Sequence, residues 1–255
     1  MDSRIKGTTR LLGLIGSPVG HSGSPAMHNY GFQALGIDAA YLAFDIKEDQ
    51  VKDAISAVRT LNMQGLNVTM PCKTEAAKYM DELSPAARLI GAVNTVVNRD
   101  GKLYGHITDG EGFVANLKDH GVSIGKKDIV IFGAGGAATA ILVQCALDGA
   151  NSVTVINPRD DFFGRAEEMH KKLREETPDC DITLIDLADE AAVKEAVSKT
   201  DILINGTLLG MKPKEDTSVI RDTSLFRKDM VVADVVYNPK ETKLLREAKA
   251  AGCRT

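Results

Sequence analysis

Amide, hydroxyl and ammonium groups follow one another closely in the first third of the chain. Residues 65–68 read Gly-Leu-Asn-Val, which is typical of a short buried strand, and Asn67, Thr69 and Lys73 stand at or just beyond its end. Ligands of open α/β sheets bind where parallel strands end, so these side chains could line a ligand site. Lys73 also begins an expected helix, where the helix dipole disfavours a cation. A surface lysine is the alternative, and position alone leaves the two interpretations equal.

Two serines precede the first expected helix. Ser24 is followed by Pro25, and this pair suits a helix start with serine as N-cap and proline at the first helical position. Ser22 is not needed for that cap. The two hydroxyls could instead hold an anionic or hydroxylated ligand.

Asn94 and Asp109 also have both a structural and a functional interpretation. Asn94 interrupts the apolar side of an expected strand at residues 91–98, so it must hydrogen-bond either to backbone or to a ligand. Asp109 comes just before an expected helix at residues 111–120 and could serve only as its N-cap.

A complete dinucleotide-binding pattern lies in the middle of the chain. A β-branched run at residues 129–132 is followed by Gly133, Gly135 and Ala138, which have the G-x-G-x-x-G/A spacing. A small-residue helix, a second apolar strand and Asp160 come next. Such glycines bring backbone N–H groups close to a pyrophosphate, and the acid accepts from ribose hydroxyls. The alternative is an ordinary α/β unit that binds no nucleotide.

Composition restricts the class of protein. A formal net charge of -4 over 255 residues argues against a nucleic-acid partner, which would require a basic face. The amino terminus lacks the apolar core of a signal peptide, and no apolar segment is long enough to span a bilayer, so we expect a cytoplasmic protein without a membrane partner. The histidines His21 and His28 lack a third ligand, so no metal is expected. The scattered cysteines suggest reduced thiols rather than disulfides or zinc ligands: Cys72, Cys145, Cys180 and Cys253.

Strand and helix patterns alternate along almost the whole chain, which predicts an α/β fold with a doubly wound parallel sheet. Beyond those already given, strands are expected at 11–15, 41–44, 102–107, 153–156, 182–185, 202–204 and 230–235, and helices at 47–61, 137–148, 162–176, 190–198 and 241–251.

Seven short motifs occur in one order from residue 22 to residue 239. They are Ser22-x-Ser24-Pro25, Asn67-Val68-Thr69-x-Pro71-x-Lys73, Gly91-Ala92-x-Asn94-Thr95, Thr108-Asp109-Gly110, Gly133-Ala134-Gly135-Gly136-Ala137, Asn205-Gly206-Thr207-x-x-Gly210-Met211 and Tyr237-Asn238-Pro239. With these motifs the chain resembles the shikimate/quinate dehydrogenase family. The resemblance implies an N-terminal α/β substrate domain at residues 1–110, to which residues 239–255 return. It also implies a Rossmann-type nucleotide domain at residues 111–238, with a cleft between the domains.

The same resemblance implies an activity and a site. The expected reaction is reversible hydride transfer between NAD(P)H and the C3 oxygen of 3-dehydroshikimate or 3-dehydroquinate. Lys73 and Asp109 match the catalytic pair, and a lysine close to an aspartate can stabilise a developing alkoxide and relay its proton. Asn67, Thr69 and Asn94 match partners of the ring hydroxyls, and Ser22, Ser24 and Tyr237 match partners of the carboxylate. The expected cofactor residues are Gly133, Ala134, Gly135, Gly136, Ala137, Asn157, Arg159, Asp160, Phe163, Thr207, Gly210, Met211 and Val235.

The segment after the second nucleotide-domain strand favours NAD. Members of the family that use NADP typically have Asn-Arg-Thr here, whereas this chain has Pro158 in place of that arginine. Asp160 would repel a 2′-phosphate and accept from ribose hydroxyls. The chain therefore resembles the NAD-accepting subgroup that oxidises quinate as well as shikimate. NADP stays possible because Arg159 could meet a 2′-phosphate.

Several alternatives stay open at this level. The substrate could be another hydroxylated ring acid of the aminoshikimate type, or the chain could bind nucleotide and substrate without turnover. Either a monomer or a homodimer is compatible with the sequence. The family continues beyond a segment like residues 252–255 with a substrate-contacting Gln and helices that pack on the first domain. We therefore expect either an incomplete sequence or a shortened form.

Overall fold

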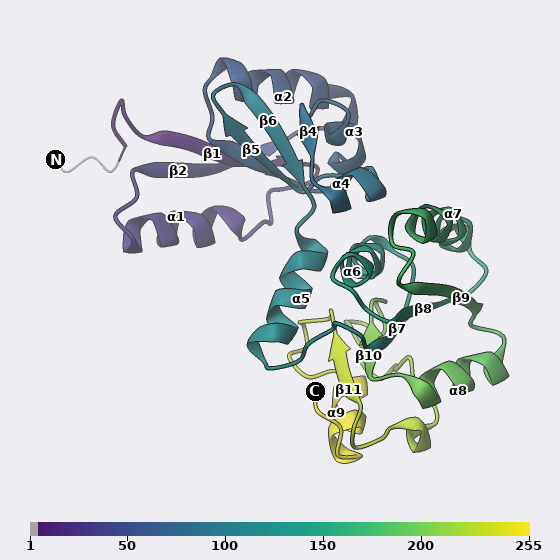
Figure 1. Cartoon of the computed structure of the whole chain (residues 1–255). Helices are drawn as coiled ribbons and strands as arrows, with labels where there is room; N and C mark the ends of the chain where they lie inside the picture. The colour runs from purple at the N-terminus through teal and green to yellow at the C-terminus, as the bar shows by residue number, and fades with distance from the viewer. Residues whose placement is uncertain (1–4) are drawn as a thin grey trace. The chain divides into compact units, whose positions relative to one another are not determined.

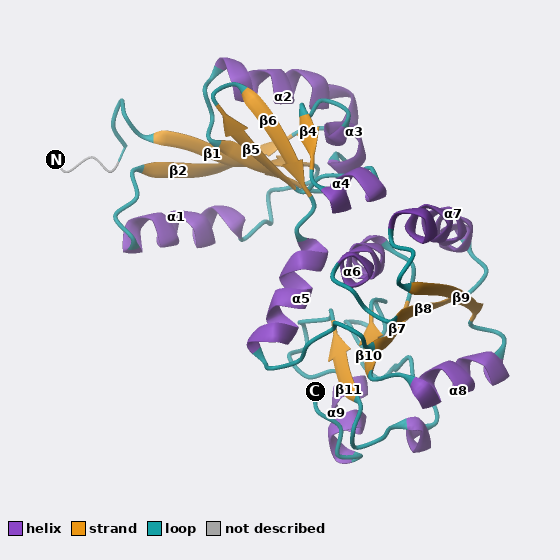
Figure 2. Ribbon diagram, viewed as in Figure 1, coloured by secondary structure: helices purple, strands orange, loops and turns teal. Residues whose placement is uncertain are grey.

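A computed structural model describes residues 5–255, and it divides the chain into two compact units, Met1–Thr108 and Asp109–Thr255. Each unit is built on its own β-sheet (Figure 2). The boundary between the units falls immediately before Asp109, where the sequence predicted a boundary after residue 110.

The first unit contains a six-stranded mixed sheet in the order β2-β1-β3-β5-β6-β4. Strand β1 pairs in parallel with β2 and β3, whereas β5 is antiparallel to β3 and β6. Helices α1 and α2 lie on opposite faces of this sheet (Figure 1). The strands are β1 (Arg10–Gly16), β2 (Ala39–Asp45), β3 (Gly65–Val68), β4 (Glu82–Leu83), β5 (Thr95–Arg99) and β6 (Lys102–His106). The helices are α1 (Ser24–Ala34), α2 (Val51–Thr60), α3 (Lys73–Ala77) and α4 (Pro85–Ile90), with a 3-10 turn at Glu48–Gln50.

Apolar periodicity explains how α2 is held on the sheet. Val51, Ile55 and Val58 recur at helical spacing, and all three are buried. Such a stripe covers one side of a helix and removes apolar surface from water. The strand expected at 91–98 begins instead at Thr95, because Gly91 adopts a left-handed conformation that ends α4 and residues 92–94 connect the two elements.

The second unit contains a five-stranded, entirely parallel sheet in the order β11-β10-β7-β8-β9. Helices α6 and α7 cover one face, and α8 and α9 cover the other (Figure 1). The chain moves outward from β7 in one direction to β9 and then in the other direction to β11, so the strand order reverses between β7 and β10. Ligands of doubly wound sheets bind at such a reversal. The strands are β7 (Asp128–Phe132), β8 (Ser152–Asn157), β9 (Asp181–Asp186), β10 (Ile202–Asn205) and β11 (Val231–Asp234). The helices are α5 (Asp109–Asp119), α6 (Gly136–Leu147), α7 (Asp161–Glu176), α8 (Glu190–Lys199) and α9 (Lys243–Ala250), with a 3-10 turn at Thr223–Leu225.

The chain end belongs to the second unit, which corrects the expectation that residues 239–255 return to the substrate domain. Leu244 and Ala248 of α9 are buried in one apolar cluster with Met230 and Val232. The segment after the helix continues this packing, since Arg254 forms a parallel bridge with Val231. Burial of the apolar side of α9 therefore decides where this segment lies.

Helix α5 approaches α6 so closely that one position on it must be glycine. A Cβ built on Gly110 would lie 2.2 Å from the carbonyl oxygen of Ala140. Real carbon and oxygen atoms do not approach to this distance, so any side chain would push the helices apart. Gly110 therefore fixes how the first turn of α5, which begins with Asp109, lies on α6.

Two substitutions on α5 should have opposite effects. We expect Gly110→Ala to lower the free energy of unfolding by about 1–3 kcal/mol or more, because the added methyl group overpacks the contact with α6. Gly112→Ala is the matched control, since nothing lies within 4 Å of a Cβ at that position. It should raise stability by about 0.5–1 kcal/mol, as alanine does in an exposed helix interior. Urea unfolding followed by circular dichroism measures both changes, and equal changes in the two variants would contradict the packing argument.

Candidate functional site

The glycine loop between β7 and α6 leaves backbone groups open to a ligand. Gly133 has a φ of +101°, which suits glycine, and its N–H donates to the carbonyl of Ile156 at 2.8 Å. Gly135 precedes α6 in an extended conformation, and no side chain caps the helix. Nothing lies within 4 Å of a Cβ built on Gly135 or Gly136. The first N–H groups of a helix are unpaired and carry partial positive charge. The loop therefore fits the pyrophosphate of a dinucleotide. Within it Ala134 is buried, and Ala137 is exposed on the first turn of α6.

Four of the expected cofactor residues lie together where β8 leads into α7. Asn157 is buried, and its Nδ2 donates to the carbonyl of Pro158 and to Asp160 Oδ1, both at 2.8 Å. Asp160 Oδ1 also accepts from the N–H of Phe162 at 2.9 Å, so this carboxylate is the N-cap of α7. No residue within 5–255 donates a hydrogen bond to Asp160 Oδ2. Asp160 thus combines the structural role of a cap with an oxygen that can accept from ribose hydroxyls.

Arg159 and Phe163 complete this group. The guanidinium carbon of Arg159 lies 4.7 Å from the centre of the Phe163 ring, within the range of a cation–π contact. Its Nε donates to Asp186 Oδ2 at 2.8 Å. The arginine that could meet a 2′-phosphate is therefore already paired with a carboxylate.

The loop after β10 is held by a hydrogen-bonded network centred on Asn205. Asn205 is only 1% exposed, and its Oδ1 accepts from the N–H and hydroxyl of Thr207 at 3.0 and 2.7 Å. Its Nδ2 donates to the carbonyl of Leu209 at 3.1 Å and to Asp234 Oδ1 at 2.9 Å. This network fixes the positions of Thr207 and of the segment that leads to Gly210 and Met211, all of them expected cofactor residues.

Asp234 links that loop to the neighbouring strand end. Its Oδ1 also accepts from the N–H of Val236 at 2.9 Å, and its Oδ2 accepts from the Thr242 hydroxyl at 2.7 Å. Burial raises the pKa of the Asp234 carboxyl, and the bonds from Thr242, Val236 and Asn205 oppose this shift. Sequence reasoning missed Asn205 and Asp234 as site residues. The sequence does contain a sign of them, because each is a polar residue at the end of an apolar strand and must find a hydrogen-bond partner there.

In the first unit, Asn67 lies in a network with four other polar residues. Its Oδ1 accepts from the Tyr41 hydroxyl at 2.7 Å, and its Nδ2 donates to the Asn94 carbonyl at 3.3 Å and to Thr95 Oγ1 at 3.2 Å. Asn94 Oδ1 accepts from the Thr95 hydroxyl at 3.0 Å and from the N–H and hydroxyl of Thr108 at 3.0 and 3.2 Å. Burial raises the pKa of Tyr41 to about 12. The sequence left open whether Asn94 bonds within the protein or to a ligand. In the structure, its side-chain oxygen bonds within the protein.

The expected serines form a turn rather than a cap. Ser22 Oγ accepts from the Ser24 N–H at 3.2 Å, and α1 begins at Ser24 itself, with Gly23 in the preceding position and no side-chain cap. The expectation that Ser24 caps the helix is therefore wrong, because the local bond from the Ser24 N–H to Ser22 organises this turn instead. Both serines are half-buried.

The remaining candidates occupy the starts of helices and a strand end. Lys73 is the first residue of α3 and is half-buried, and Thr69 follows β3. Asp109 is the first residue of α5 and lies in the second unit. Tyr237 also lies there, after β11, and this residue is 88% exposed. Val235 is half-buried between Asp234 and Val236.

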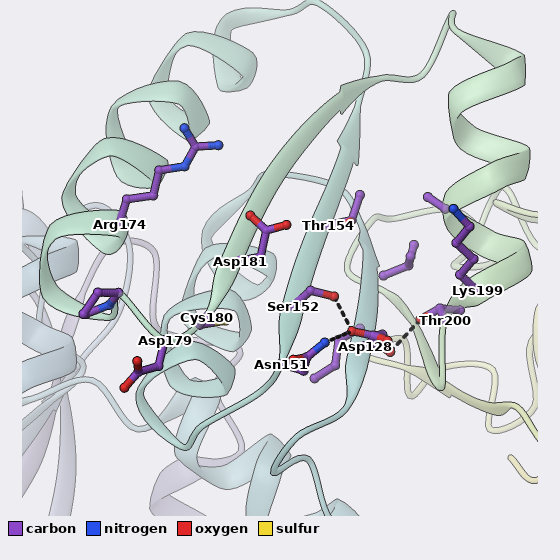
Figure 3. Close-up of a pocket in the computed structure, with 14 residues that line it drawn as sticks. Asp128, Asn151, Ser152, Thr154, Arg174, Asp179, Cys180, Asp181, Lys199 and Thr200 are labelled. Atoms are coloured by element: carbon purple, nitrogen blue, oxygen red, sulfur yellow. Dashed lines mark hydrogen bonds between the residues drawn. The ribbon is translucent and has the colours of Figure 1, made fainter.

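A hollow of about 690 Å³ lies elsewhere in the second unit (Figure 3). It is formed at the amino-terminal ends of β7, β8 and β9, where Asp128 Oδ1 accepts from Asn151 Nδ2 and Ser152 Oγ, each at 2.6 Å. Parallel sheets bind ligands at the opposite, carboxyl ends of their strands. The hydrogen bonds of Asp128 therefore tie neighbouring strand starts together and do not form part of the candidate site.

Residues 5–255 also bear on whether the chain has a metal site, a disulfide or a membrane span. Residues 5–255 contain no group of three or more His, Cys, Asp or Glu side chains placed to hold a metal ion. All four cysteines are free and buried. In the same range, no helix combines the length and the apolar character needed to cross a bilayer.

The fold and the glycine loop define a two-unit α/β protein with a Rossmann-type dinucleotide-binding sheet. Residues 14–96 match the family model described as the shikimate dehydrogenase substrate binding domain. A shikimate dehydrogenase (NADP(+)) from Listeria monocytogenes is 46% identical over 252 residues, which are 99% of this chain and 86% of that relative. The chain belongs to the shikimate dehydrogenase family.

Solved structures agree with this assignment. The crystal structure of shikimate 5-dehydrogenase from Listeria monocytogenes in complex with shikimate and NAD matches with a TM-score of 0.97 and 46% identity, covering 100% of this chain and 88% of that one. Quinate dehydrogenase from Corynebacterium glutamicum in complex with NAD matches with a TM-score of 0.84 and 31% identity, covering 97% and 87%. The resemblance inferred from the motifs, the fold class and the assignment to the oxidoreductases are thereby confirmed.

Removal of the Asn205 amide should cost much more stability than removal of an exposed one. We expect Asn205→Ala to lower the free energy of unfolding by at least about 2 kcal/mol, because it leaves several buried polar groups of the loop and of Asp234 without partners. Asn151→Ala is the matched control, since Asn151 is exposed and makes its bond to Asp128 at the surface. Its loss should be below about 1 kcal/mol. Chemical unfolding compares the two variants, and similar losses would show that the network does not hold the loop.

Proposed function

We propose that this protein interconverts shikimate and 3-dehydroshikimate, accepts quinate as a second substrate, and prefers NAD to NADP. The observation that carries the proposal is the glycine loop after β7, which leaves the N-terminus of α6 open for a pyrophosphate. The relatives from Listeria monocytogenes support shikimate as the substrate, and the quinate dehydrogenase from Corynebacterium glutamicum supports quinate.

In this proposal the nicotinamide cofactor, when bound, supplies or accepts the hydride. The glycine loop would hold its pyrophosphate, Asp160 Oδ2 and Asn157 would face the adenosine ribose, and the loop fixed by Asn205 would contact the nicotinamide end. Thr207, Gly210, Met211 and Val235 belong to this last region.

Lys73 and Asp109 are proposed to handle the proton. When a ring ketone receives hydride at carbon, its oxygen becomes an alkoxide and must gain a proton. An ammonium at Lys73 would stabilise the negative oxygen and donate that proton, and the Asp109 carboxylate would favour the charged lysine and pass on a replacement proton. In the oxidation direction the same groups would remove the proton from the hydroxyl.

Preorganised polar groups would recognise the ring acid. Asn67 and Asn94 hold each other in place through Thr95 and Thr108. No residue within 5–255 accepts a hydrogen bond from Asn94 Nδ2, so this amide has donors for a ring hydroxyl. Thr69 is proposed to contact a second hydroxyl, and Ser22, Ser24 and Tyr237 to bind the carboxylate. Fixed donors favour binding because little side-chain entropy is lost.

Substitution of Lys73 should separate turnover from binding. We expect Lys73→Ala and Asp109→Asn each to lower kcat by roughly 10²-fold or more, with a much smaller change in KM, because proton transfer contributes mainly in the transition state. If the two act as a unit, the double variant should lose little more than either single one. Absorbance of the reduced cofactor with shikimate gives the rates.

Lys78→Ala is the control for Lys73→Ala, because Lys78 is an exposed lysine that directly follows the same helix and pairs with Glu75. It should leave kcat within about twofold of the parent value. A Lys73 variant that loses affinity and turnover equally would indicate a binding role instead.

Cofactor preference follows from the charges near Asp160. We expect a larger kcat/KM with NAD than with NADP, because Asp160 accepts from ribose hydroxyls and repels a 2′-phosphate. Steady-state kinetics with shikimate and with quinate, each with both cofactors, measures the preference. A preference for NADP of about tenfold or more would show that the loop 157–163 recognises the phosphate.

A further inference from the structure

Arg159 is the one residue in the loop 157–163 whose charge favours a 2′-phosphate, and it is not electrostatically isolated. Its Nε donates to Asp186 Oδ2 at 2.8 Å while its guanidinium carbon lies 4.7 Å from the Phe163 ring centre. Two contacts from different elements therefore define its position: Asp186 ends β9, and Phe163 lies in the first turn of α7.

The carboxylate is the more firmly fixed partner of this ion pair. Asp186 lies opposite Asn157 in the register of β8 and β9, and its Oδ1 accepts from the N–H of Ala188 at 2.9 Å. The next residue, Leu187, donates its N–H to the Asn157 carbonyl at 3.0 Å. The side chain of Asp186 is 25% exposed, whereas that of Arg159 is 70% exposed. The sheet thus holds the carboxylate, and the long arginine side chain extends to it.

The pairing changes what a bound dinucleotide would meet. A guanidinium and the carboxylate it contacts form a pair with little net charge, and Asp160 adds a second carboxylate next to Arg159 in sequence. A 2′-phosphate carries nearly two negative charges and would be repelled by both acids. A 2′-hydroxyl is neutral and can donate to a carboxylate oxygen.

We propose that Asp186 is a determinant of cofactor specificity, which holds Arg159 in an ion pair and so lowers the affinity for a 2′-phosphorylated dinucleotide relative to the unphosphorylated one. The inference rests on the proposed use of NAD, and it adds a residue on a different strand from the loop that follows β8. Removal of the Asp186 charge leaves the arginine available to a phosphate.

Isothermal titration of the full chain with NAD⁺ and with NADP⁺, without substrate, tests this directly. We expect Asp186→Asn to tighten NADP⁺ binding roughly three- to tenfold and to leave the Kd for NAD⁺ within about twofold. The shift should decrease as salt is added, because screening weakens the interaction between exposed charges. Retained NAD⁺ binding also shows that the variant is folded.

Asp181→Asn is the matched control, since it makes the same change of charge on the same strand but at the first residue of β9, away from Arg159. It should leave the ratio of the two Kd values unchanged. In a second test, Arg159→Gln combined with Asp186→Asn should abolish the gain in NADP⁺ affinity, because the released guanidinium is then absent.

The outcomes separate the two proposals. An unchanged Kd ratio in Asp186→Asn, or the same change in Asp181→Asn, overturns the role of Asp186. A parent protein that binds NADP⁺ more tightly than NAD⁺ contradicts the proposed preference. In that case the ratio between variants still decides whether Asp186 opposes the phosphate.

Discussion

Polar side chains at the buried ends of strands need hydrogen-bond partners, and this requirement shapes the candidate site more than any other. Asn205 has almost no contact with water, and an unpaired amide there would cost a large part of the net stability of a domain. Each of its polar atoms is bonded, to the loop that follows β10 and to Asp234 at the end of β11. One side chain therefore determines the course of a loop that carries several proposed cofactor contacts.

In the sheet of the first unit, polar side chains at strand ends likewise find hydrogen-bond partners. Asn67 and Asn94 stand where β3 ends and β5 begins. Hydroxyls of Tyr41 and Thr95 pair with the Asn67 amide, and hydroxyls of Thr95 and Thr108 donate to Asn94 Oδ1. Because these bonds are made within the protein, the orientation of each amide is set before any ligand binds. Preorganisation of this kind suits a polyhydroxylated acid, whose recognition depends on where donors and acceptors point. Both units thus combine an apolar core with a polar strand end.

Charge at the adenosine end of the proposed cofactor site is also decided by pairing. Asp160 uses one oxygen to cap α7, so the proposed recognition of ribose hydroxyls falls to the other oxygen of the same carboxylate. Arg159 is drawn to Asp186 and over Phe163. One guanidinium is thus balanced against two carboxylates, Asp160 and Asp186, in this part of the second unit.

The sequence by itself determined the alternation of strands and helices, the βαβ unit with its glycine loop, and the family, because periodicity, helix signals and motif spacing are properties of neighbouring residues. The predicted bounds of β3 and α2 and the predicted start of α6 lie within a few residues of the observed ones. Only the tertiary structure decided that α9 packs on the second sheet, that Asn94 bonds to Thr108, that Asp234 joins Asn205, and that Asp186 holds Arg159. In the sequence, Asn94 and Thr108 are 14 residues apart, Asn205 and Asp234 are 29 apart, and Arg159 and Asp186 are 27 apart. Sheet order and register bring them together, and local propensity contains no information on either.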